Sequence, residues 1–236
     1  MKAVILAGGE GTRLRPLTLT IPKALVPVRD RTLTDQVLDI LKKAGTSEVV
    51  LGISYLAEKI KDYFEKNPFP GIKIGYVIEQ NRMGTAGPLI LLKRTACRYD
   101  DNFFVVNGDN LFSLDLSAMI DFHKEHGGVA TIALTAVEDV TKFGVARTKG
   151  DKIIDFIEKP KIEEAPSNLI NSGYYIFSPE IFDYIDEAAD FLMLEKDIFP
   201  QLAKAGKLYG FIGEGQWFDT GTPERYQAVK DNWRGV

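Results

Sequence analysis

The residues of this chain most able to do chemistry are a glycine-rich stretch and the basic residues that follow it. Glycine occupies three of the four positions 8–11, directly after the apolar segment 3–7, and Arg13 and Lys23 come next. Glycine lets the backbone adopt conformations that a side chain forbids, so unobstructed N–H groups can approach an anion. The two basic side chains add mobile positive charge. The stretch is therefore predicted to bind phosphate groups.

Two better-known glycine loops do not fit this spacing. A Walker loop needs a lysine followed by serine or threonine directly after its last glycine, whereas Thr12 and Arg13 follow Gly11 here. A dinucleotide-binding fingerprint that started at Gly9 would need glycine or alanine where Leu14 stands. The sequence thus predicts a phosphate-binding loop of another kind.

Composition and charge indicate a globular protein and exclude several partners. The 236 residues are 45% hydrophobic and 26% charged, which are ordinary values for globular proteins. A net charge of −4 argues against a nucleic-acid partner, and no apolar run is long enough to span a membrane. Cys97 is the single cysteine, so no internal disulfide can form. We expect a cytoplasmic protein without nucleic-acid or membrane partners, and a homo-oligomer is compatible with this composition.

Hydrophobic periodicity predicts alternating strands and helices up to Gly128 and a strand-rich segment after it. A helix is expected to end at Gly45, because glycine commonly terminates helices. The predicted helices cover 33–41, 56–64, 195–204 and 224–232, and the predicted strands cover 3–7, 49–53, 72–78, 103–106, 130–137, 144–147, 152–158 and 171–177.

This order of elements predicts an α/β fold with a Rossmann-like, mixed and largely parallel sheet flanked by helices. Right-handed crossovers bring the loops that follow parallel strands to one edge of the sheet. Residues 8–15, 84–87 and Asp109 are therefore expected to lie at that edge. No segment has the composition of a linker, so a single domain over 1–236 is expected.

The glycine loop is the first of a series of motifs. In chain order they are Gly8 to Thr18 with Pro22-Lys23, Gly84-Thr85-Ala86-Gly87, Asn107-Gly108-Asp109, Phe143-Gly144-Val145, Glu158-Lys159-Pro160, Asn171-Ser172-Gly173 and Trp217-Phe218-Asp219-Thr220-Gly221. Their wording and order resemble those of the sugar-1-phosphate nucleotidylyltransferases, the nucleotide-sugar pyrophosphorylases.

The resemblance implies the nucleotide-diphospho-sugar transferase fold. Residues up to about 128 would then bind the nucleotide, and residues 129–236 would bind the sugar. Many family members continue into a β-helical domain built of repeats. Because this chain stops shortly after Asp219, we expect no such domain here.

The implied reaction joins a nucleoside triphosphate to a sugar 1-phosphate and releases pyrophosphate. Every reactant is anionic and the sugar phosphate brings its own nucleophile, so positioning and charge neutralisation are the main catalytic requirements. Mg²⁺ is the natural bridging cation, since it prefers carboxylate and phosphate oxygens. By resemblance, Asp109 and Asp219 are the two metal ligands.

The resemblance also assigns the other roles. Arg13 would hold the departing pyrophosphate, and Lys23 would reach the α-phosphate and the incoming sugar phosphate. Lys159 would bind the sugar phosphate, while Glu158 would accept hydrogen bonds from sugar hydroxyls. The predicted catalytic residues are Arg13, Lys23, Asp109 and Asp219; the predicted nucleotide-binding residues are Leu6, Ala7, Gly8, Gly9, Gly11, Thr12, Arg13, Gln80, Gly84 and Thr85; the predicted sugar-phosphate-binding residues are Asn107, Gly144, Glu158, Lys159 and Asn171.

Substrate identity is the least constrained part of this interpretation. The string from Gly84 to Leu89 resembles that of guanylyl-transferring members that use mannose 1-phosphate, so GTP and mannose 1-phosphate are the leading choice. Thymidylyl- and uridylyl-transferring members that use glucose 1-phosphate share nearly all the other motifs and remain alternatives. A non-catalytic regulatory subunit that binds nucleotide sugars and a cytidylyltransferase of the phosphocholine type also stay open. The presence of every predicted catalytic residue favours an enzyme.

His123 and His126 are spaced i, i+3 on a predicted helix that ends at Gly127. Residues at this spacing share one face of a helix. We interpret that face as an exposed polar surface and assign neither histidine a catalytic role.

Overall fold

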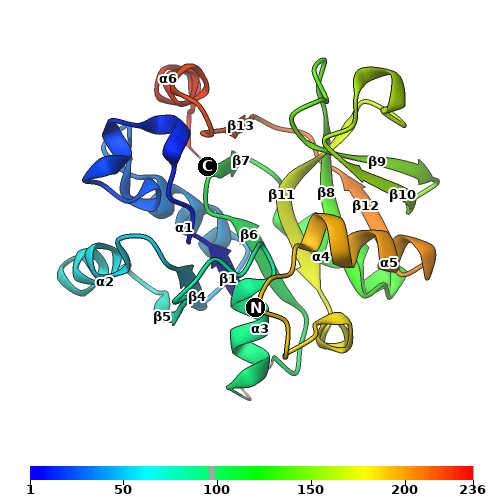
Figure 1. Ribbon diagram of the computed structural model, residues 1–236, viewed down its shortest axis with the longest axis horizontal. Helices are drawn as coiled ribbons and strands as arrows, with labels where there is room; N and C mark the ends of the chain where they lie inside the picture. Colours follow the sequence, from blue (N-terminus) through cyan, green and yellow to red (C-terminus); the bar gives the residue numbers. More distant parts are fainter. Residues whose placement is uncertain (96–98, 236) are drawn as a thin grey trace. The chain divides into compact units, whose positions relative to one another are not determined.

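The computed structural model describes residues 1–95 and 99–235 (Figure 1). Two compact units divide the chain: the first comprises Met1–Asn81, Val106–Leu114 and Gly215–Val236, and the second comprises Arg82–Val105 and Asp115–Glu214. These units do not coincide with the halves expected on either side of residue 128. Cys97 lies outside the described residues. No helix in the described ranges has the length and apolar composition needed to cross a membrane.

The first unit contains parallel strands and the helices that connect them. In chain order they are β1 (Lys2–Leu6), α1 (Leu33–Lys43), β4 (Glu48–Ile53), α2 (Ala57–Lys66) and β5 (Lys73–Ile78). Strand β4 lies between β1 and β5 and pairs in parallel with both. The helices and strands predicted over these residues are confirmed.

Helix α1 shows why the local sequence signals worked. Its start is a capping box, in which Thr32 and Asp35 each accept a hydrogen bond from the other's backbone N–H. The residues at helical spacing, from Leu33 to Leu41, are buried. Gly45 lies just beyond the helix with φ of +76°, a conformation that favours glycine and ends the helix.

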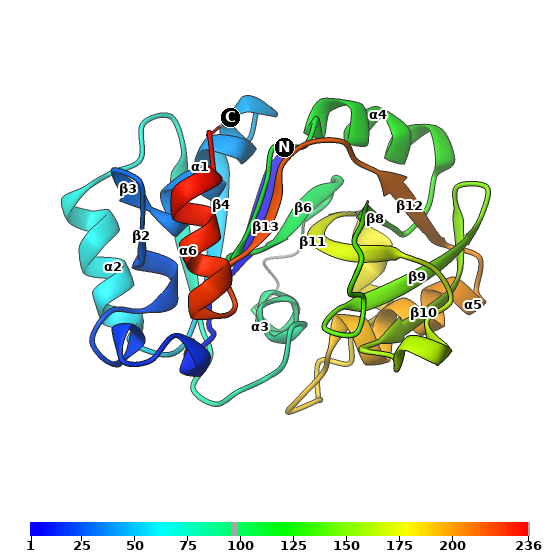
Figure 2. The same ribbon diagram turned by 90° about the horizontal axis from the view of Figure 1, so that it is seen from above.

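Chain segments far apart in the sequence complete the first unit. They are β2 (Pro27–Val28), β3 (Arg31–Thr32), β7 (Asn110–Phe112), β13 (Trp217–Asp219) and α6 (Pro223–Asn232). Figure 2 shows α6 next to α1 and β2. Trp233, just after α6, donates its indole N–H to Gln36 Oε1 at 3.0 Å, and the Tyr226 hydroxyl donates to the Pro27 carbonyl. These bonds hold the C-terminal segment on the first helix of the chain.

The second unit is richer in antiparallel strands. Its elements are α3 (Gly87–Arg94), α4 (Leu116–His126), β8 (Ala130–Ala136), β9 (Gly144–Lys149), β10 (Lys152–Glu158), β11 (Leu169–Phe177), α5 (Phe199–Lys204) and β12 (Leu208–Ile212). Strands β8 and β12 pair in parallel, and the other described pairs of this unit are antiparallel. Figure 2 shows α4 and α5 on opposite sides of these strands. The predicted mixed α/β fold is confirmed.

The remaining elements are short or shared. Strand β6 (Phe103–Asn107) begins in the second unit and ends in the first. The helix predicted over 195–204 is two successive segments, a π-helical turn η6 (Leu194–Ile198) and α5. The short 3-10 helices are η1 (Thr12–Leu14), η2 (Leu17–Leu19), η3 (Lys23–Leu25), η4 (Ile162–Glu164) and η5 (Pro179–Tyr184).

The predicted exposure of the two histidines on α4 is wrong for His123. Its side chain is buried at 2% exposure, and its Nδ1 lies 2.8 Å from Thr131 Oγ1 on β8. Burial lowers the pKa of His123 to about 4, against an opposing effect of the Glu180 charge. The physical reason is helical spacing: His123 continues the buried face formed by Leu116 and Met119 at i, i+3, i+7.

Candidate active site

The glycine loop follows β1 in the first unit and leads into η1. Gly11 has φ of +61°, a left-handed conformation that favours glycine. A Cβ atom on Gly11 would lie 2.9 Å from Thr18 Cγ2 and 3.2 Å from Lys23 Cβ, so this glycine also permits the close approach of the Lys23 segment. A Cβ atom on Gly9 would meet no atom within 4 Å. The loop thus has one packed side and one open side, as binding of a ligand by its backbone requires.

Lys23 and Asp109 form an ion pair across 86 residues of sequence, with 2.6 Å between Nζ and Oδ2. Gly108 allows this approach, because its N–H donates to the Leu6 carbonyl at 2.9 Å and a Cβ atom there would crowd the same oxygen. Burial raises the pKa of Asp109, but the charge and hydrogen bond of Lys23, together with the Arg13 charge, lower it below its ordinary value. Asp109 is therefore ionised at neutral pH.

Asp219 lies beside Asp109 because β13, which ends at Asp219, pairs with β7, which begins directly after Asp109. In the antiparallel pair of β13 and β7, Asp219 is opposite Asn110. Thr220 donates both its backbone N–H, at 3.0 Å, and its hydroxyl, at 2.8 Å, to the Asp109 carbonyl. Asp109, directly before β7, and Asp219, the last residue of β13, thus lie at the same end of this strand pair.

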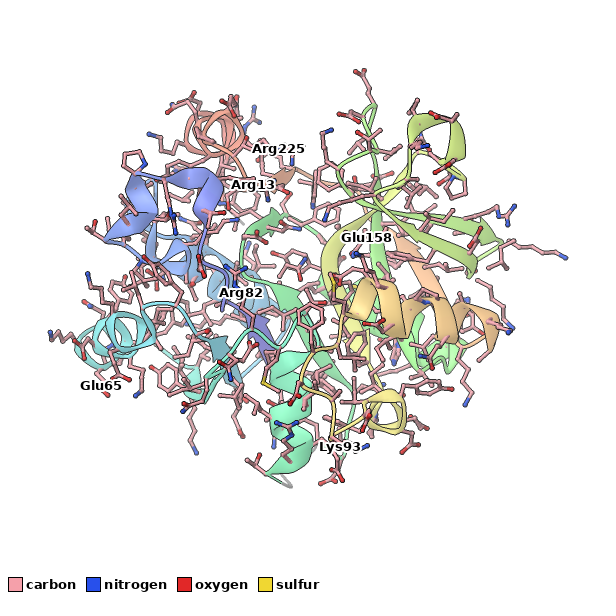
Figure 3. All side chains as sticks on the ribbon, in the orientation of Figure 1. Arg13, Glu65, Arg82, Lys93, Glu158 and Arg225 are labelled. Atoms are coloured by element: carbon pink, nitrogen blue, oxygen red, sulfur yellow. The ribbon has the colours of Figure 1, made fainter. Side chains whose placement is uncertain are left out.

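Two arginines flank the turn that follows Asp219. The Gly221 N–H donates to Asp219 Oδ1, and the Arg225 guanidinium donates to Asp219 Oδ2 at 3.3 Å. A Cβ atom on Gly221 would lie 3.0 Å from Arg13 Nη2, so the Arg13 guanidinium packs directly on this glycine. Figure 3 shows Arg13 and Arg225 close to each other. The first unit therefore gathers cations from three parts of the chain around two carboxylates.

The donor set fits Mg²⁺ bound by two carboxylates together with substrate oxygens. Mg²⁺ takes oxygen ligands, keeps several waters and is commonly held by one or two carboxylates plus phosphates. Asp109 and Asp219 provide these carboxylates, and both side chains remain partly exposed, at 37% and 15%. Within the described ranges, no three His, Cys, Asp or Glu side chains cluster as a metal cage would require.

The second unit carries a separate group of predicted residues at the end of β10. Glu158 and Lys159 form an ion pair of 2.8 Å, in which the Lys159 side chain is 61% exposed and that of Glu158 is 11% exposed. Lys159 has φ of +50°, a strained conformation for a residue with a side chain. Gly144 lies opposite Glu158, and a Cβ atom on Gly144 would lie 2.9 Å from Glu158 Oε2 and would clash with the Phe156 ring. Gly144 thus leaves room for Glu158.

The structure gives Gly84 and Thr85 packing partners in the segment 192–195. Gly84 has φ of +80°, and a Cβ atom there would clash with the Leu192 carbonyl. The Thr85 hydroxyl donates to Glu195 Oε2 at 2.5 Å and accepts from the Leu194 N–H at 2.9 Å. Burial, and then the Glu158 charge, raise the pKa of Glu195 against the opposing Thr85 hydrogen bond and Lys159 charge. Both predicted nucleotide-binding residues therefore also hold a second loop in place.

Asn171 is likewise engaged within the second unit. Its side-chain oxygen accepts from the Gly173 N–H at 2.9 Å, and its amide donates to the Tyr175 hydroxyl at 2.9 Å. These bonds span the irregularity in the pairing of β11 with β8. The structure therefore gives Asn171 a role in shaping the strand that the sequence did not indicate.

The predicted residues divide between the units. The first unit holds Leu6, Ala7, Gly8, Gly9, Gly11, Thr12, Arg13, Lys23, Gln80, Asn107, Asp109 and Asp219, and the second holds Gly84, Thr85, Gly144, Glu158, Lys159 and Asn171. Asn107, predicted to bind the sugar phosphate, is the last residue of β6 and directly precedes Gly108 and Asp109 in the first unit. The Gln80 side chain is exposed.

Sequence reasoning missed Arg225 and Glu195. Arg225 belongs to no motif, although a basic residue in the first turn of a helix, where acids are preferred, was a readable signal. Glu195 lies in a predicted helix and offers no signal of its contact with Thr85.

Residues 2–234 match the family model described as nucleotidyl transferase. The chain is 41% identical over 229 residues to a Xenopus laevis protein named mannose-1-phosphate guanyltransferase beta-A, covering 96% of this chain and 62% of that protein. It is 38% identical over 244 residues to a UTP–glucose-1-phosphate uridylyltransferase from Synechocystis, covering 98% of this chain and 63% of the relative. The chain thus spans about three fifths of the length of these curated relatives.

Among solved structures, a putative glucose-1-phosphate thymidylyltransferase from Bacillus anthracis superposes with a TM-score of 0.89 at 28% identity, over 100% of this chain and 96% of that one. The HddC protein of Yersinia pseudotuberculosis, determined with GMP-PN, gives a TM-score of 0.81 at 27% identity over 98% of both chains. The family match, the relatives and the similar structures agree with the resemblance seen in the motifs. This chain belongs to the nucleotidyl transferase family.

Proposed function

We propose that the protein transfers a nucleotidyl group from a nucleoside triphosphate to a sugar 1-phosphate in the presence of Mg²⁺, giving a nucleotide sugar and pyrophosphate. One observation carries this proposal: Lys23, Asp109, Arg13 and Asp219 gather beside a glycine loop with an open side. Such a group of charges suits the neutralisation and alignment of phosphates. The names of the relatives, all transferases acting on sugar 1-phosphates, support the same reaction.

The reaction needs no protein nucleophile. An oxygen of the sugar phosphate attacks the α-phosphorus of the triphosphate, the bond from that phosphorus to the bridging oxygen of the β-phosphate breaks, and pyrophosphate leaves with the electron pair. Lys23 stabilises the charge on the α-phosphate, and Arg13 stabilises the leaving pyrophosphate. In-line positioning and electrostatic stabilisation account for most of the rate in this chemistry.

Asp109 and Asp219 would hold the metal. Mg²⁺, when bound there, neutralises the phosphate oxygens and fixes their orientation. The Lys23 ammonium keeps Asp109 ionised by lowering its pKa, so this ligand needs no deprotonation before it binds a cation. The Gly221 N–H orients the Asp219 carboxylate.

Glu158 and Lys159 would bind the sugar 1-phosphate. The half-exposed Lys159 side chain supplies charge for the phosphate, and its left-handed backbone fixes the direction in which the side chain leaves β10. The Glu158 carboxylate, for which Gly144 leaves room, accepts hydrogen bonds from the sugar hydroxyls. Loss of a hydrogen bond from a site built to bind a hydroxyl group is costly, so this pair also discriminates between sugars.

GTP and mannose 1-phosphate are the substrates we favour. Relatives at 40–41% identity from Xenopus laevis and Yarrowia lipolytica are named mannose-1-phosphate guanyltransferases. UTP or dTTP with glucose 1-phosphate is the second candidate, which the Synechocystis relative and the Bacillus anthracis structure support. The single cysteine supports a reducing compartment such as the cytoplasm.

Pyrophosphate release tests the proposal. GTP, UTP, dTTP, CTP and ATP are each combined with mannose, glucose and N-acetylglucosamine 1-phosphates in the presence of Mg²⁺. Sugar-dependent release in one combination establishes the reaction and its substrates. Asp219→Asn should reduce turnover by about a hundredfold or more, as removal of a catalytic electrostatic partner does. Asp155→Asn, which also removes the carboxylate of an Arg–Asp pair, is the matched control and should retain activity.

If no combination of substrates released pyrophosphate, the proposed enzyme activity would be refuted. If nucleotide sugars still bound the silent protein, a regulatory subunit without catalysis would be favoured instead. Release from CTP with a phosphorylated amino alcohol in place of a sugar phosphate would favour a cytidylyltransferase of a different substrate class.

A further inference from the structure

Each carboxylate assigned to Mg²⁺ is also paired with a basic side chain. Lys23 Nζ lies 2.6 Å from Asp109 Oδ2, and Arg225 Nη1 lies 3.3 Å from Asp219 Oδ2. On Asp219 the other oxygen, Oδ1, accepts the Gly221 N–H. Both oxygens of Asp219 therefore already accept a hydrogen bond, and a divalent cation that binds through Oδ2 shares that oxygen with the Arg225 guanidinium.

The position of Arg225 in the sequence is unfavourable for its helix. It is the third residue of α6, in the first turn, and the Thr222 side chain caps its N–H. The N-terminus of a helix carries partial positive charge, which disfavours a cation there. The guanidinium is nevertheless only one-third exposed and is directed at Asp219. A negatively charged partner, here Asp219, offsets the cost of placing Arg225 at the N-terminus of α6.

Arg13 places a second guanidinium at the same turn. Its Nη2 contacts Gly221, which lies between Asp219 and the start of α6, and Figure 3 shows the two arginines near each other. Guanidinium groups bind phosphate oxygens with paired N–H donors. Lys23, which pairs with Asp109, adds a third basic group near these two carboxylates.

We propose that Arg225 competes with Mg²⁺ for Asp219 and, when Mg²⁺ takes that carboxylate, binds the pyrophosphate portion of the nucleotide beside Arg13. This inference rests on the proposed function, because it assigns the leaving group of that reaction. Arg225 thus changes its partner when the substrate binds. Before the metal arrives it pairs with Asp219, and afterwards it binds an oxygen of the β- or γ-phosphate.

The test measures binding to the full chain without turnover. Mg²⁺ and, separately, inorganic pyrophosphate with Mg²⁺ are titrated by calorimetry into the wild type and Arg225→Gln. The variant should bind Mg²⁺ alone about three- to fivefold more tightly, since it no longer competes for Asp219. It should bind pyrophosphate about tenfold more weakly, since it loses a charge-assisted contact. The two affinities thus move in opposite directions, which no general loss of structure can produce.

Arg147→Gln is the matched control, because Arg147 also pairs with an aspartate, Asp155, at 3.1 Å. It should leave both affinities unchanged. Arg225→Lys retains the charge without the paired donors, so it should bind Mg²⁺ as the wild type does and pyrophosphate about threefold more weakly. This variant carries the test if the glutamine variant does not fold.

Affinities in Arg225→Gln that fall together, or that stay at wild-type values, would overturn the inference. These results can be told apart from failure of the proposed function, in which the wild type releases no pyrophosphate with any substrate combination. If the wild type is an active enzyme but the Arg225 variants bind pyrophosphate as tightly as it does, the inference is refuted and the proposed function is not.

Discussion

Replacing Lys23 with methionine should destabilise the first unit at neutral pH and spare it in acid. Lys23 lowers the pKa of Asp109 against the opposing effect of burial. A carboxyl group with a lowered pKa in the folded state contributes stability that is present above the unfolded pKa of about 4 and is lost as the pH falls through the folded value. The variant leaves the Asp109 carboxylate without this partner. The difference in the free energy of unfolding between variant and wild type should therefore be full above about pH 4 and become smaller below it.

The magnitude follows from exposure. Removing one partner of a fully buried ion pair costs about 3–5 kcal/mol, whereas exposed pairs contribute about 0–1 kcal/mol. The Lys23 side chain is 11% exposed and that of Asp109 is 37% exposed, so solvent screens this pair in part. We expect a loss of about 1–2 kcal/mol in the free energy of unfolding. Methionine keeps the apolar stem of the side chain, which limits the loss of packing.

Urea unfolding followed by tryptophan fluorescence measures this loss, because both tryptophans of the chain, Trp217 and Trp233, lie in the first unit. A cycle with Asp109→Asn isolates the interaction between the two side chains. Lys124→Met, in a cycle with Asp121→Asn, is the control, since that pair is 3.9 Å apart and well exposed. A coupling no larger than that of the control pair, or a difference that does not narrow in acid, would refute the reasoning.

Three other substitutions test the second unit. Gly144→Ala should cost about 1–3 kcal/mol of stability, because its Cβ atom would press on Phe156 and Glu158, and it should raise the KM for the sugar 1-phosphate. Urea unfolding and initial-rate assays measure the two effects. Gly75→Ala is the control and should change neither value, because its Cβ atom would lie 3.7 Å from Val50. His123 favours the neutral form when folded, so the stability linked to its burial should be full above the unfolded pKa of about 6.5 and should fall by about 2 kcal/mol between roughly pH 6.5 and pH 5. His123→Gln should lose this dependence in the same unfolding assay, and an unchanged slope would contradict the assigned burial effect. Thr85→Val should cost about 1–3 kcal/mol of stability and speed hydrogen exchange at Leu194, because Glu195 and the Leu194 N–H each lose a hydrogen-bond partner. Thr85→Ser keeps the hydroxyl and should behave as wild type. Equal exchange rates in the two variants would show that the Thr85 hydroxyl does not hold this segment.

The elements of the fold were largely predictable because their signals are local. The leucine spacing of α1, its cap at Thr32 and the glycine that follows it all lie within about a dozen residues. The same holds for the glycine loop, whose need for a left-handed residue at Gly11 is a property of the backbone there. The closeness of the glycine loop and Asp109 also followed from a simple rule, since the loops that follow parallel strands meet at one edge of the sheet.

The rest depended on contacts that no local pattern records. Thr85 and Glu195 meet across 110 residues, and the Asn171 amide meets Tyr175 only because β11 is irregular. His123 is a different case: its i, i+3, i+7 spacing with Leu116 and Met119 indicated the buried face of α4, and only its partner Thr131, on β8, could not be read locally. The partition of the chain into interleaved units follows from the sum of such contacts and left no mark on composition.

The first unit takes its last strand and helix from residues 215–236, which has a consequence for the order of synthesis. At about 5–20 residues per second, roughly 7–27 s separate translation of Asn81 from that of Gly215. During that interval β7 has no β13 to pair with, and Gln36 lacks the Trp233 indole. A nascent chain therefore makes the glycine loop early but acquires Asp219 and Arg225 much later, so it cannot assemble the full set of charged groups around the loop until residues 215–236 have been made.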